Sequence, residues 1–206
     1  MKSVILVGNG ASLLSDEYGK KIDEFDIVVR VNNFAINGFE KHVGTKRTVH
    51  FRCYNIRPKT FSLEHVVPAI DNHGISGLQD NRYDDFEEAV ILKIREKSYI
   101  KACQEVGLYK KISYIDDSEY TRYLKMIGTS APTTGVLCIA YAIERWTDVT
   151  ICGFDCLQGD APSTEYCHYF SNMKFNQVER KKHNFIKEES FVKNLINIKK
   201  ITCLMK

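Results

Sequence analysis

An apolar stretch at the start of the chain leads directly into a Gly-Asn-Gly turn: residues 4–14 read VILVGNGASLL. A short run rich in Val and Ile is typical of a strand covered on both faces, so residues 4–7 are predicted as a buried strand. Glycines after such a strand allow close approach to a ligand, and a following helix presents free N–H groups to an anion. Gly8, Asn9 and Gly10 therefore predict a phosphate-binding loop. A second interpretation is that Asn9 only adopts a left-handed turn conformation.

Strand-like and helix-like segments alternate through the rest of the chain. This pattern predicts an α/β fold with a single, doubly wound, mostly parallel sheet of the Rossmann-like kind, whose ligand site lies at the carboxyl ends of the strands. Residues 1–206 are predicted to form one domain, because 206 residues with 44% apolar content support one core. The further predicted strands are 27–31, 48–54, 89–94, 113–116, 149–152 and 201–204; the helices are 11–24 (with Ser12 as its start cap), 118–125, 134–145 and 177–194; loops are expected over 58–88 and 158–176.

Composition excludes several classes of function. With 29 basic and 26 acidic residues, the net charge of +3 gives no broad basic surface for nucleic acid. The seven cysteines include no CxxC pair, which indicates reduced thiols in a cytoplasmic protein. No signal pattern precedes the first strand, and the longest apolar stretch, residues 136–143, is less than half the ~20 residues that a membrane-spanning helix requires.

A cytoplasmic location without a transmembrane anchor is therefore expected. Basic clusters at residues 180–182 and 199–200 allow peripheral contact with an anionic surface at the inner face of the membrane. Solvated surface groups are the simpler interpretation of these clusters.

The glycine turn does not match a dinucleotide site. Such a site requires a third glycine where Leu13 stands, and an acidic residue at the end of the second strand, where residues 30–33 read Arg-Val-Asn-Asn. An NAD-dependent oxidoreductase is therefore disfavoured. Asn9 and Asn32 instead end two strands with neutral amide side chains, which suit phosphate oxygens, ribose hydroxyls or a base edge.

A second candidate site lies in residues 131–146, which read APTTGVLCIAYAIERW. Pro132 restricts the chain ahead of Thr133 and Thr134, either of which can cap a helix, and Gly135 allows close approach to the helix N-terminus. A carboxylate or phosphate would be stabilised there. The same residues also make an ordinary helix start.

Two histidines in the last quarter of the chain are candidates for proton transfer. His168 lies in CHYF and His183 in HNFIKEES, and neither HxxxH nor HxxxE spacing occurs, so no metal and no cofactor are expected. Neutral imidazoles suit acid–base chemistry near neutral pH. The other histidines are predicted to be surface residues: His42, His50, His65 and His73.

Four ordered motifs resemble those of the sialyltransferases in glycosyltransferase family 29. Residues 4–49 resemble the large sialyl motif, with its Val-Gly-Asn turn, Tyr-Gly-x-x-Ile-Asp segment, Asp-x-Val-x-Arg-x-Asn strand and Gly-Phe-x-x-x-Val-Gly tail. Residues 132–155 are similar to the small motif, residues 168–170 to the third motif, and His183-x4-Glu188 to the very small motif. The resemblance implies the GT-A-variant fold of these enzymes and transfer of sialic acid from a CMP-linked donor, a co-substrate, to a glycan hydroxyl.

The resemblance also implies roles for individual residues. His168 would hydrogen-bond the departing phosphate, and His183 would be the general base. The donor would be held by four segments: Asn9, Gly10 and Ala11 together with Asn32 at the phosphate and nucleoside; Thr133, Thr134 and Gly135 at the carboxylate and cytidine; and Gly153, Phe154 and Asp155 near the base or ribose.

Metal-independent, inverting chemistry is compatible with these roles. CMP leaves with a single phosphate group, so a histidine and helix N–H groups can replace the metal that nucleoside diphosphate donors often require. A base on the face opposite the leaving phosphate takes the proton of the acceptor hydroxyl, and the anomeric configuration inverts. Two alternatives stay open: the transferred acid sugar is Kdo, or the chain is a catalytically silent nucleotide-binding module of the same fold.

The chain departs from animal members of the family in three features. Those members join the large and small motifs by a disulfide, whereas here no cysteine precedes residue 4, so Cys138 or Cys152 lacks that partner. The small motif has Thr-Thr-Gly where Ser-Thr-Gly is commoner, and a protein without the stem and Golgi anchor is expected. A short bacterial-type or viral member is therefore expected, with a glycan or lipid-linked saccharide as acceptor.

Overall fold

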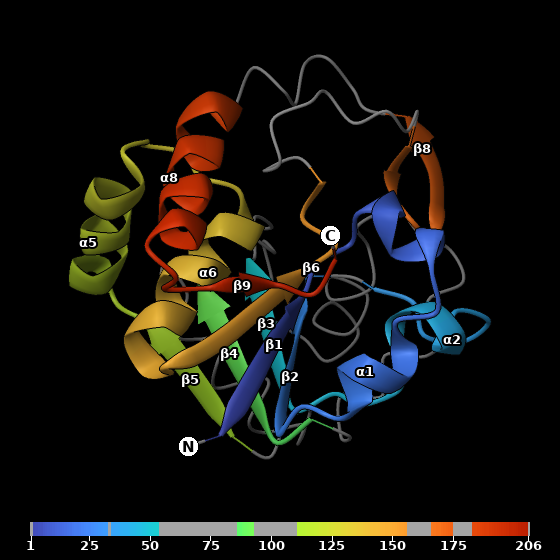
Figure 1. Cartoon of the computed structure of the whole chain (residues 1–206). Coiled ribbons are helices and arrows are strands. Elements are labelled where there is room, and N and C mark those ends of the chain that lie inside the picture. The colour runs from blue at the N-terminus through green and yellow to red at the C-terminus, as the bar shows by residue number, and fades with distance from the viewer. Residues whose placement is uncertain are drawn as a thin grey trace, which may run out of the picture.

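A seven-stranded parallel sheet forms the centre of the protein (Figure 1). The computed structural model describes residues 2–32, 34–53, 86–92, 111–155, 166–174 and 183–205. Every strand pair of this sheet is parallel, which confirms the predicted α/β class and doubly wound sheet. In spatial order the strands are β5 (Ile112–Ile115), β4 (Glu88–Leu92), β3 (Val49–Cys53), β2 (Ile27–Val31), β1 (Ser3–Val7), β6 (Asp148–Cys152) and β9 (Thr202–Cys203).

Helices cover both faces of the sheet. On one side lie α5 (Asp117–Ile127), α6 (Thr134–Arg145) and α8 (Phe185–Asn197), and on the other lie the 3-10 helix η1 (Ala11–Ser15), α1 (Gly19–Asp23) and α2 (Glu40–Val43) (Figure 1). β1 has β2 on one side and β6 on the other, and the strand order reverses there. In open α/β sheets the crevice outside this reversal is the preferred place for a ligand.

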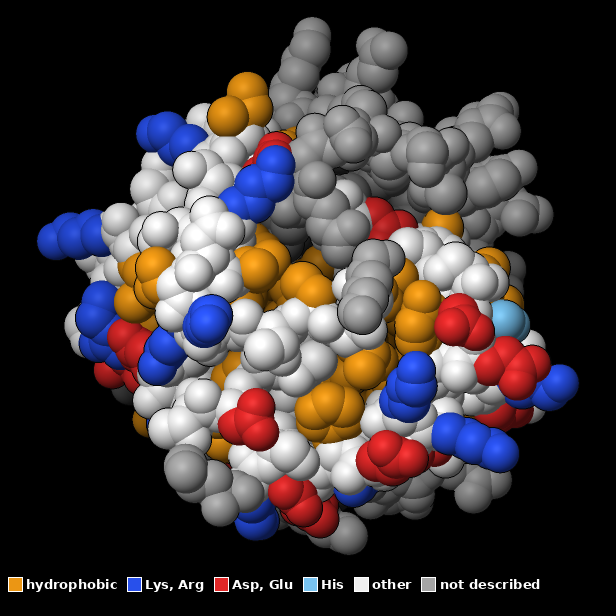
Figure 2. Space-filling view, viewed as in Figure 1, with side chains coloured by type: hydrophobic (Ala, Val, Ile, Leu, Met, Phe, Trp, Pro, Cys, Tyr) orange, Lys and Arg blue, Asp and Glu red, His pale blue; other side chains and the backbone are white. Residues whose placement is uncertain are grey.

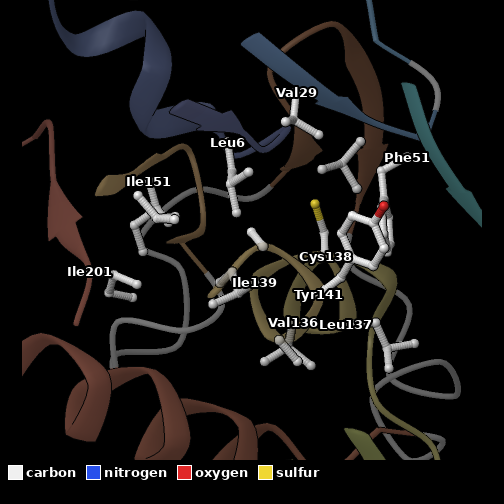
Figure 3. Close-up of a cluster of buried hydrophobic side chains, with 14 of the residues drawn as sticks. Leu6, Val29, Phe51, Val136, Leu137, Cys138, Ile139, Tyr141, Ile151 and Ile201 are labelled. Carbon is white, nitrogen blue, oxygen red and sulfur yellow. The ribbon is translucent and has the colours of Figure 1, made fainter. Parts of the chain in front are cut away.

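The larger core lies between the sheet and α6. Figure 3 shows Cys138 and Tyr141 of α6 directed at the sheet, where the Tyr141 ring lies 5.5 Å from the ring of Phe51. Seven consecutive residues of α6, 136–142, are buried, because the sheet covers one side of the helix and α5 and α8 cover the other. Burying a large apolar side chain stabilises a fold by ~1.5–3 kcal/mol. This packing fixes α6 and hence the position of its N-terminus.

Local sequence signals explain where α5 begins and ends. The Asp116 carboxylate accepts from the Glu119 N–H at 2.8 Å, and the Glu119 carboxylate accepts from the Asp116 N–H at 3.2 Å, which makes a capping box. Gly128 ends the helix with φ +81°, a left-handed conformation that glycine adopts without strain. The chain can then turn back toward α6.

Three sequence predictions are wrong in detail. Residues 11–24 do not form one helix: η1 ends at Ser15 and α1 begins at Gly19, and Gly10 rather than Ser12 is the first cap, because Ser12 binds Asp155. The expected loop 158–176 contains a hairpin of β7 (Tyr166–His168) and β8 (Ser171–Lys174). Asn184 caps α8 by accepting from the Lys187 N–H, so that helix begins at Phe185, and it extends to Asn197.

Several predictions fall on segments outside the described residues, which are 54–85, 93–110, 156–165 and 175–182. These predictions concern most of the expected loop 58–88, His65, His73 and the basic cluster 180–182.

The described residues contain no helix with the length and apolar character needed to span a bilayer. Hydrophobic side chains are visible in the middle of the face drawn in Figure 2, and charged side chains lie to the left of them, to the right and below. Cys138 and Cys152 are buried free thiols, and Cys203 is a half-buried one. Burial raises the pKa of Cys138 and of Cys152, the latter to about 12, so both thiols are protonated at neutral pH.

Candidate functional site

The turn after β1 lies against the turn after β6. The Gly8 N–H donates to the Cys152 carbonyl at 2.9 Å, and the Gly10 N–H donates to the Gly153 carbonyl at 2.8 Å. A Cβ at Gly8 would lie 2.2 Å from the Gly153 carbonyl oxygen, which no real side chain tolerates. The first glycine is therefore required for contact between two segments of the protein. Sequence analysis had explained it by approach to a ligand.

Asp155 joins these two turns through its side chain. Its carboxylate accepts from the Ser12 N–H at 2.9 Å and from the Ser12 hydroxyl. This contact requires glycine at position 10, because a Cβ there would lie 2.2 Å from the same carboxylate. Phe154, 7% exposed, packs beside Gly135 at the start of α6. The turn at 153–155 therefore contacts both the first turn and the α6 N-terminus.

The carboxyl end of β2 is held by two neighbouring strands. The Asn9 side-chain amide donates to the Val31 carbonyl at 2.9 Å, which connects the first turn to β2. Asn32 has φ +53°, a left-handed conformation that Asn adopts more readily than most residues. Its N–H donates to the Phe51 carbonyl at 2.9 Å, and its carbonyl accepts from Nε2 of His50 at 2.8 Å. Asn9 and Asn32 thus lie at adjacent strand ends, as predicted.

His168 is fixed through its neighbour Tyr169. The Tyr169 N–H donates to the Asn9 carbonyl at 3.0 Å, and its hydroxyl accepts from the Ala35 N–H at 3.1 Å while donating to the Ala35 carbonyl. Tyr169 is buried, and the His168 ring stacks on Phe170 with centroids 5.4 Å apart. The segment that contains His168 therefore lies against the turn after β1. Sequence analysis missed Tyr169, although an aromatic with a hydroxyl next to a candidate histidine was a usable signal.

The α6 N-terminus is connected to α8 by a buried carboxylate. Thr133 caps α6, its hydroxyl accepting from the Val136 N–H at 3.3 Å. The same hydroxyl donates to Glu188 at 2.6 Å, and the Thr133 N–H donates to Glu188 at 2.9 Å. Glu188 is fully buried, and burial raises the pKa of its carboxyl although the bonds from Thr133 lower it in part. Both hydrogen-bond donors of Thr133 are therefore bonded to protein, and the N–H groups of Thr134 and Gly135 follow at the helix start.

His183 also connects the segment before α6 with the segment before α8. Its Nδ1 is 2.8 Å from the Ala131 carbonyl oxygen. A carbonyl can only accept, so Nδ1 carries a proton in this contact, and in the neutral ring the lone pair then lies on Nε2. The ring borders a hollow of about 460 Å³ between residues 129–131 and 183–186. This arrangement gives a half-buried ring whose Nδ1 is bonded to protein, next to space for a second molecule.

The structure brings the predicted donor-binding residues together at one edge of the sheet. Asn9, Gly10 and Ala11, Asn32, and Gly153 to Asp155 follow β1, β2 and β6, and Thr133 to Gly135 begin the helix that Phe154 contacts. His168 joins this group through Tyr169, and His183 joins it through Ala131 and Glu188. Two segments separated by about fifty residues, 131–133 and 183–188, are therefore connected by three hydrogen bonds.

The prediction that His50 is a surface residue is wrong. His50 is completely buried on β3, its ring stacked on Phe86 at 4.8 Å and edge-on to Phe34 at 5.6 Å. Strand alternation explains this position, because His50 shares a sheet face with its β2 neighbour Arg30, which is also buried. A polar residue inside a strand that is covered on both faces was the available signal.

His50 predicts a dependence of stability on pH. Burial, with Arg52 acting in the same direction, lowers the pKa of His50 well below its usual value of 6.5. Because the unfolded chain binds this proton more readily, the free energy of unfolding falls as pH drops below about 6.5, by up to ~1.4 kcal/mol per pH unit until the folded pKa is reached. The raised pKa of Glu188 has the opposite effect on the free energy of unfolding at lower pH, because here the folded protein binds the proton more readily. Urea unfolding of the wild type and of His50→Gln across this pH range isolates the contribution of His50. If the free energy of unfolding had the same pH dependence in both proteins, the prediction would be contradicted.

Comparison with known proteins adds an independent observation. The family model described as glycosyltransferase family 29 (sialyltransferase) matches residues 1–73 and 90–200. The chain is 25% identical over 97% of its length to a rat CMP-N-acetylneuraminate-β-1,4-galactoside α-2,3-sialyltransferase, and 26% identical to the human protein of that name. It is 24% identical to a rat type 2 lactosamine α-2,3-sialyltransferase. The chain spans 56% of the length of the first two relatives and 63% of the third.

The fold is also found in solved structures. A crystal structure of a mammalian sialyltransferase in complex with Gal-β-1,3-GalNAc-ortho-nitrophenol matches with a TM-score of 0.67 and 18% identity. The match covers 99% of this chain and 69% of the other. At this identity the likeness bears on the fold, which agrees with the parallel sheet described above.

Proposed function

The chain belongs to glycosyltransferase family 29, the sialyltransferase family, and from this we propose that it transfers sialic acid from CMP-sialic acid to the hydroxyl of a β-galactoside. CMP-Kdo is the alternative donor. The relatives described above are named as α-2,3-sialyltransferases acting on β-1,4-galactosides or type 2 lactosamine, which supports a galactoside acceptor and an α-2,3 linkage.

The observation that carries this proposal is the state of His183. Its Nδ1–H donates to Ala131, so the lone pair on Nε2 can accept a proton from an alcohol. The hollow beside the ring, between residues 129–131 and 183–186, is where we place the acceptor. Hydroxyl and amide groups of Thr129, Ser130 and Asn184 suit sugar hydroxyls, and Phe185 offers an apolar surface to a sugar ring.

The donor is proposed to occupy the edge of the sheet between the ends of β1, β2 and β6. The first N–H groups of α6 have no acceptor within the helix and carry its positive dipole end, which suits the carboxylate of an acid sugar. Asn9 and Asn32 face the nucleoside and phosphate in this arrangement, and His168 donates to the leaving phosphate. A charge-assisted hydrogen bond from His168 makes the phosphate a better leaving group than it is without one, so the proposed reaction requires no metal ion.

The reaction then proceeds by direct displacement. The acceptor oxygen attacks the anomeric carbon as the bond to the CMP phosphate breaks, and Nε2 of His183 takes the hydroxyl proton. The phosphate departs with the electron pair of the broken bond, and His168 stabilises its charge. The configuration at the anomeric carbon inverts because attack and departure are on opposite faces.

One assay tests the proposal. The protein is incubated separately with CMP-sialic acid and CMP-Kdo, with and without N-acetyllactosamine or Gal-β-1,3-GalNAc, and CMP release is measured with and without EDTA. We expect release from CMP-sialic acid to rise on addition of a galactoside and to be unchanged by EDTA. No acceptor-dependent release, together with binding of CMP, would instead support the silent nucleotide-binding module. Loss of activity in EDTA that Mg²⁺ or Mn²⁺ restores would contradict the metal-independent step.

A further inference from the structure

We infer that His50, a core residue on β3, is a positioning residue that holds the carboxyl end of β2 in the conformation needed to bind the donor nucleotide. The inference rests on the proposed function, because it concerns the same donor site. His50 itself is fully buried and does not reach a ligand. It acts through Asn32, to whose carbonyl it donates at 2.8 Å.

Asn32 needs such support because of its backbone conformation. A left-handed conformation costs most residues other than glycine roughly 1–2 kcal/mol, and it is less costly for Asn but still less favourable than an ordinary conformation. The Asn32 N–H is bonded to the Phe51 carbonyl and its carbonyl to the His50 ring, so two successive residues of β3 hold both backbone polar groups of Asn32. β3 thereby fixes the direction in which the chain leaves β2.

The His50 ring is itself held by packing. Phe86 stacks on it with an interplanar angle of 16°, and Phe34 contacts its edge at 88°. The buried guanidinium groups of Arg30 on β2 and Arg52 on β3 share this face of the sheet. A neutral ring with its proton on Nε2 is the form that suits these neighbours and the Asn32 carbonyl. The hydrogen bond is therefore fixed in both distance and direction.

The position of Asn32 affects the first turn as well. The residue before it, Val31, accepts a hydrogen bond from the Asn9 side chain at 2.9 Å. A change in the backbone at Asn32 therefore also alters the acceptor on which the Asn9 amide rests. Through Asn9, whose carbonyl accepts from Tyr169, the same change reaches the segment that carries His168. The ends of β1 and β2 and the His168 segment thus depend on one buried ring.

Two substitutions separate the hydrogen bond from the packing. His50→Gln is neutral and keeps an N–H donor near Nε2 but loses the ring, whereas His50→Phe keeps a ring for Phe86 and Phe34 but cannot donate. If His50 served only the core, Phe would be the better replacement. If it positions Asn32, Gln is the better one for nucleotide binding, even where it is the less stable variant. His42→Gln is the matched control, because the ring of His42, on α2, is bonded to the Asp16 carbonyl and not to Asn32.

The test measures CMP binding by calorimetry and donor and acceptor kinetics for the wild type and the three variants. We expect His50→Phe to weaken CMP binding and raise the donor KM about tenfold, while the acceptor KM changes less than about twofold. His50→Gln should stay within about threefold of the wild type, and His42→Gln should match it. Equal CMP binding by the wild type and folded His50→Phe, or weaker binding by Gln than by Phe, would overturn the inference and leave the proposed function intact. No CMP binding by the wild type would overturn both.

The wild-type protein provides a readout that does not depend on whether His50→Phe folds. In long-range ¹H–¹⁵N spectra the buried imidazole should be neutral with its proton on Nε2, and that proton should exchange slowly with water. Addition of CMP should shift the Asn32 amide and this imidazole signal together. A proton on Nδ1 at His50, or CMP-induced shifts that spare both residues, would contradict the positioning role.

Discussion

Replacing His183 with alanine is expected to lower the rate of sugar transfer by about 10²–10⁴-fold, the usual contribution of a positioned acid–base group. The ring lies at the hollow proposed for the acceptor, not at the strand ends proposed for the donor, so CMP affinity should change less than about twofold. The change should therefore appear in kcat and leave the donor Kd almost unaltered. Initial-rate kinetics and calorimetry with CMP measure the two effects separately.

The expected loss concerns the basic nitrogen and should not depend on the size of the side chain. His183→Asn can place its side-chain N–H where Nδ1 lies and still donate to the Ala131 carbonyl, but it cannot take up a proton. It should be as inactive as the alanine variant, and His42→Ala should be fully active. Near-normal transfer by His183→Asn would show that another group removes the acceptor proton.

Replacing Glu188 with alanine should give the largest loss of stability among substitutions near the site. Two donors of the half-buried Thr133, its N–H and its hydroxyl, would lose their acceptor. Each unsatisfied group costs ~1–3 kcal/mol, and relief from burying the carboxylate offsets part of this sum. We therefore expect the free energy of unfolding to fall by about 2–4 kcal/mol, as measured by urea unfolding at neutral pH.

Matched variants distinguish the hydrogen bonds from the charge. Glu188→Gln keeps one acceptor for the Thr133 N–H and removes the charge, so it should cost less stability than alanine. Thr133→Ser keeps the hydroxyl and should be near wild type, whereas Thr133→Val loses it. A double substitution of Glu188→Ala with Thr133→Val should be less destabilising than the sum of the two single changes, because they remove the same bond. Additive effects would mean that the contact contributes little.

Much of the fold could be predicted from the sequence where one signal dominated. The predicted bounds of α6 match the structure, because a proline, a capping threonine and a sharp switch to apolar residues mark its start. The central strands were found from their runs of Val and Ile, which only a sheet covered on both faces would bury. Strand-end residues such as Asn9 and Asn32 then followed from the rule that parallel strands end at a common edge.

Other parts depended on contacts between distant residues. The segment 11–24 has helical composition, yet the bond between Ser12 and Asp155 holds its first turn as η1, and no local pattern reveals that partner. Burial of His50 depends on Phe86, which packs on it from just before β4. The contact of Glu188 with Thr133 likewise joins two motifs that are recognisable separately, and only the structure shows that they meet.

The pairing of β1 with β6 has a consequence for the order of folding. Residue 4 pairs with residue 149 of β6, whereas the pairs β1–β2, β2–β3, β3–β4 and β4–β5 each join strands that follow one another in the sequence. Contacts between distant parts of a chain form late, because the loop they close costs more entropy. The N-terminal strands can therefore assemble on a ribosome before β6 is synthesised, but the junction of Gly8 with Gly153 cannot. Nucleotide affinity should consequently be acquired only in the last stage of biosynthesis, which makes it a sensitive indicator of a fully folded product.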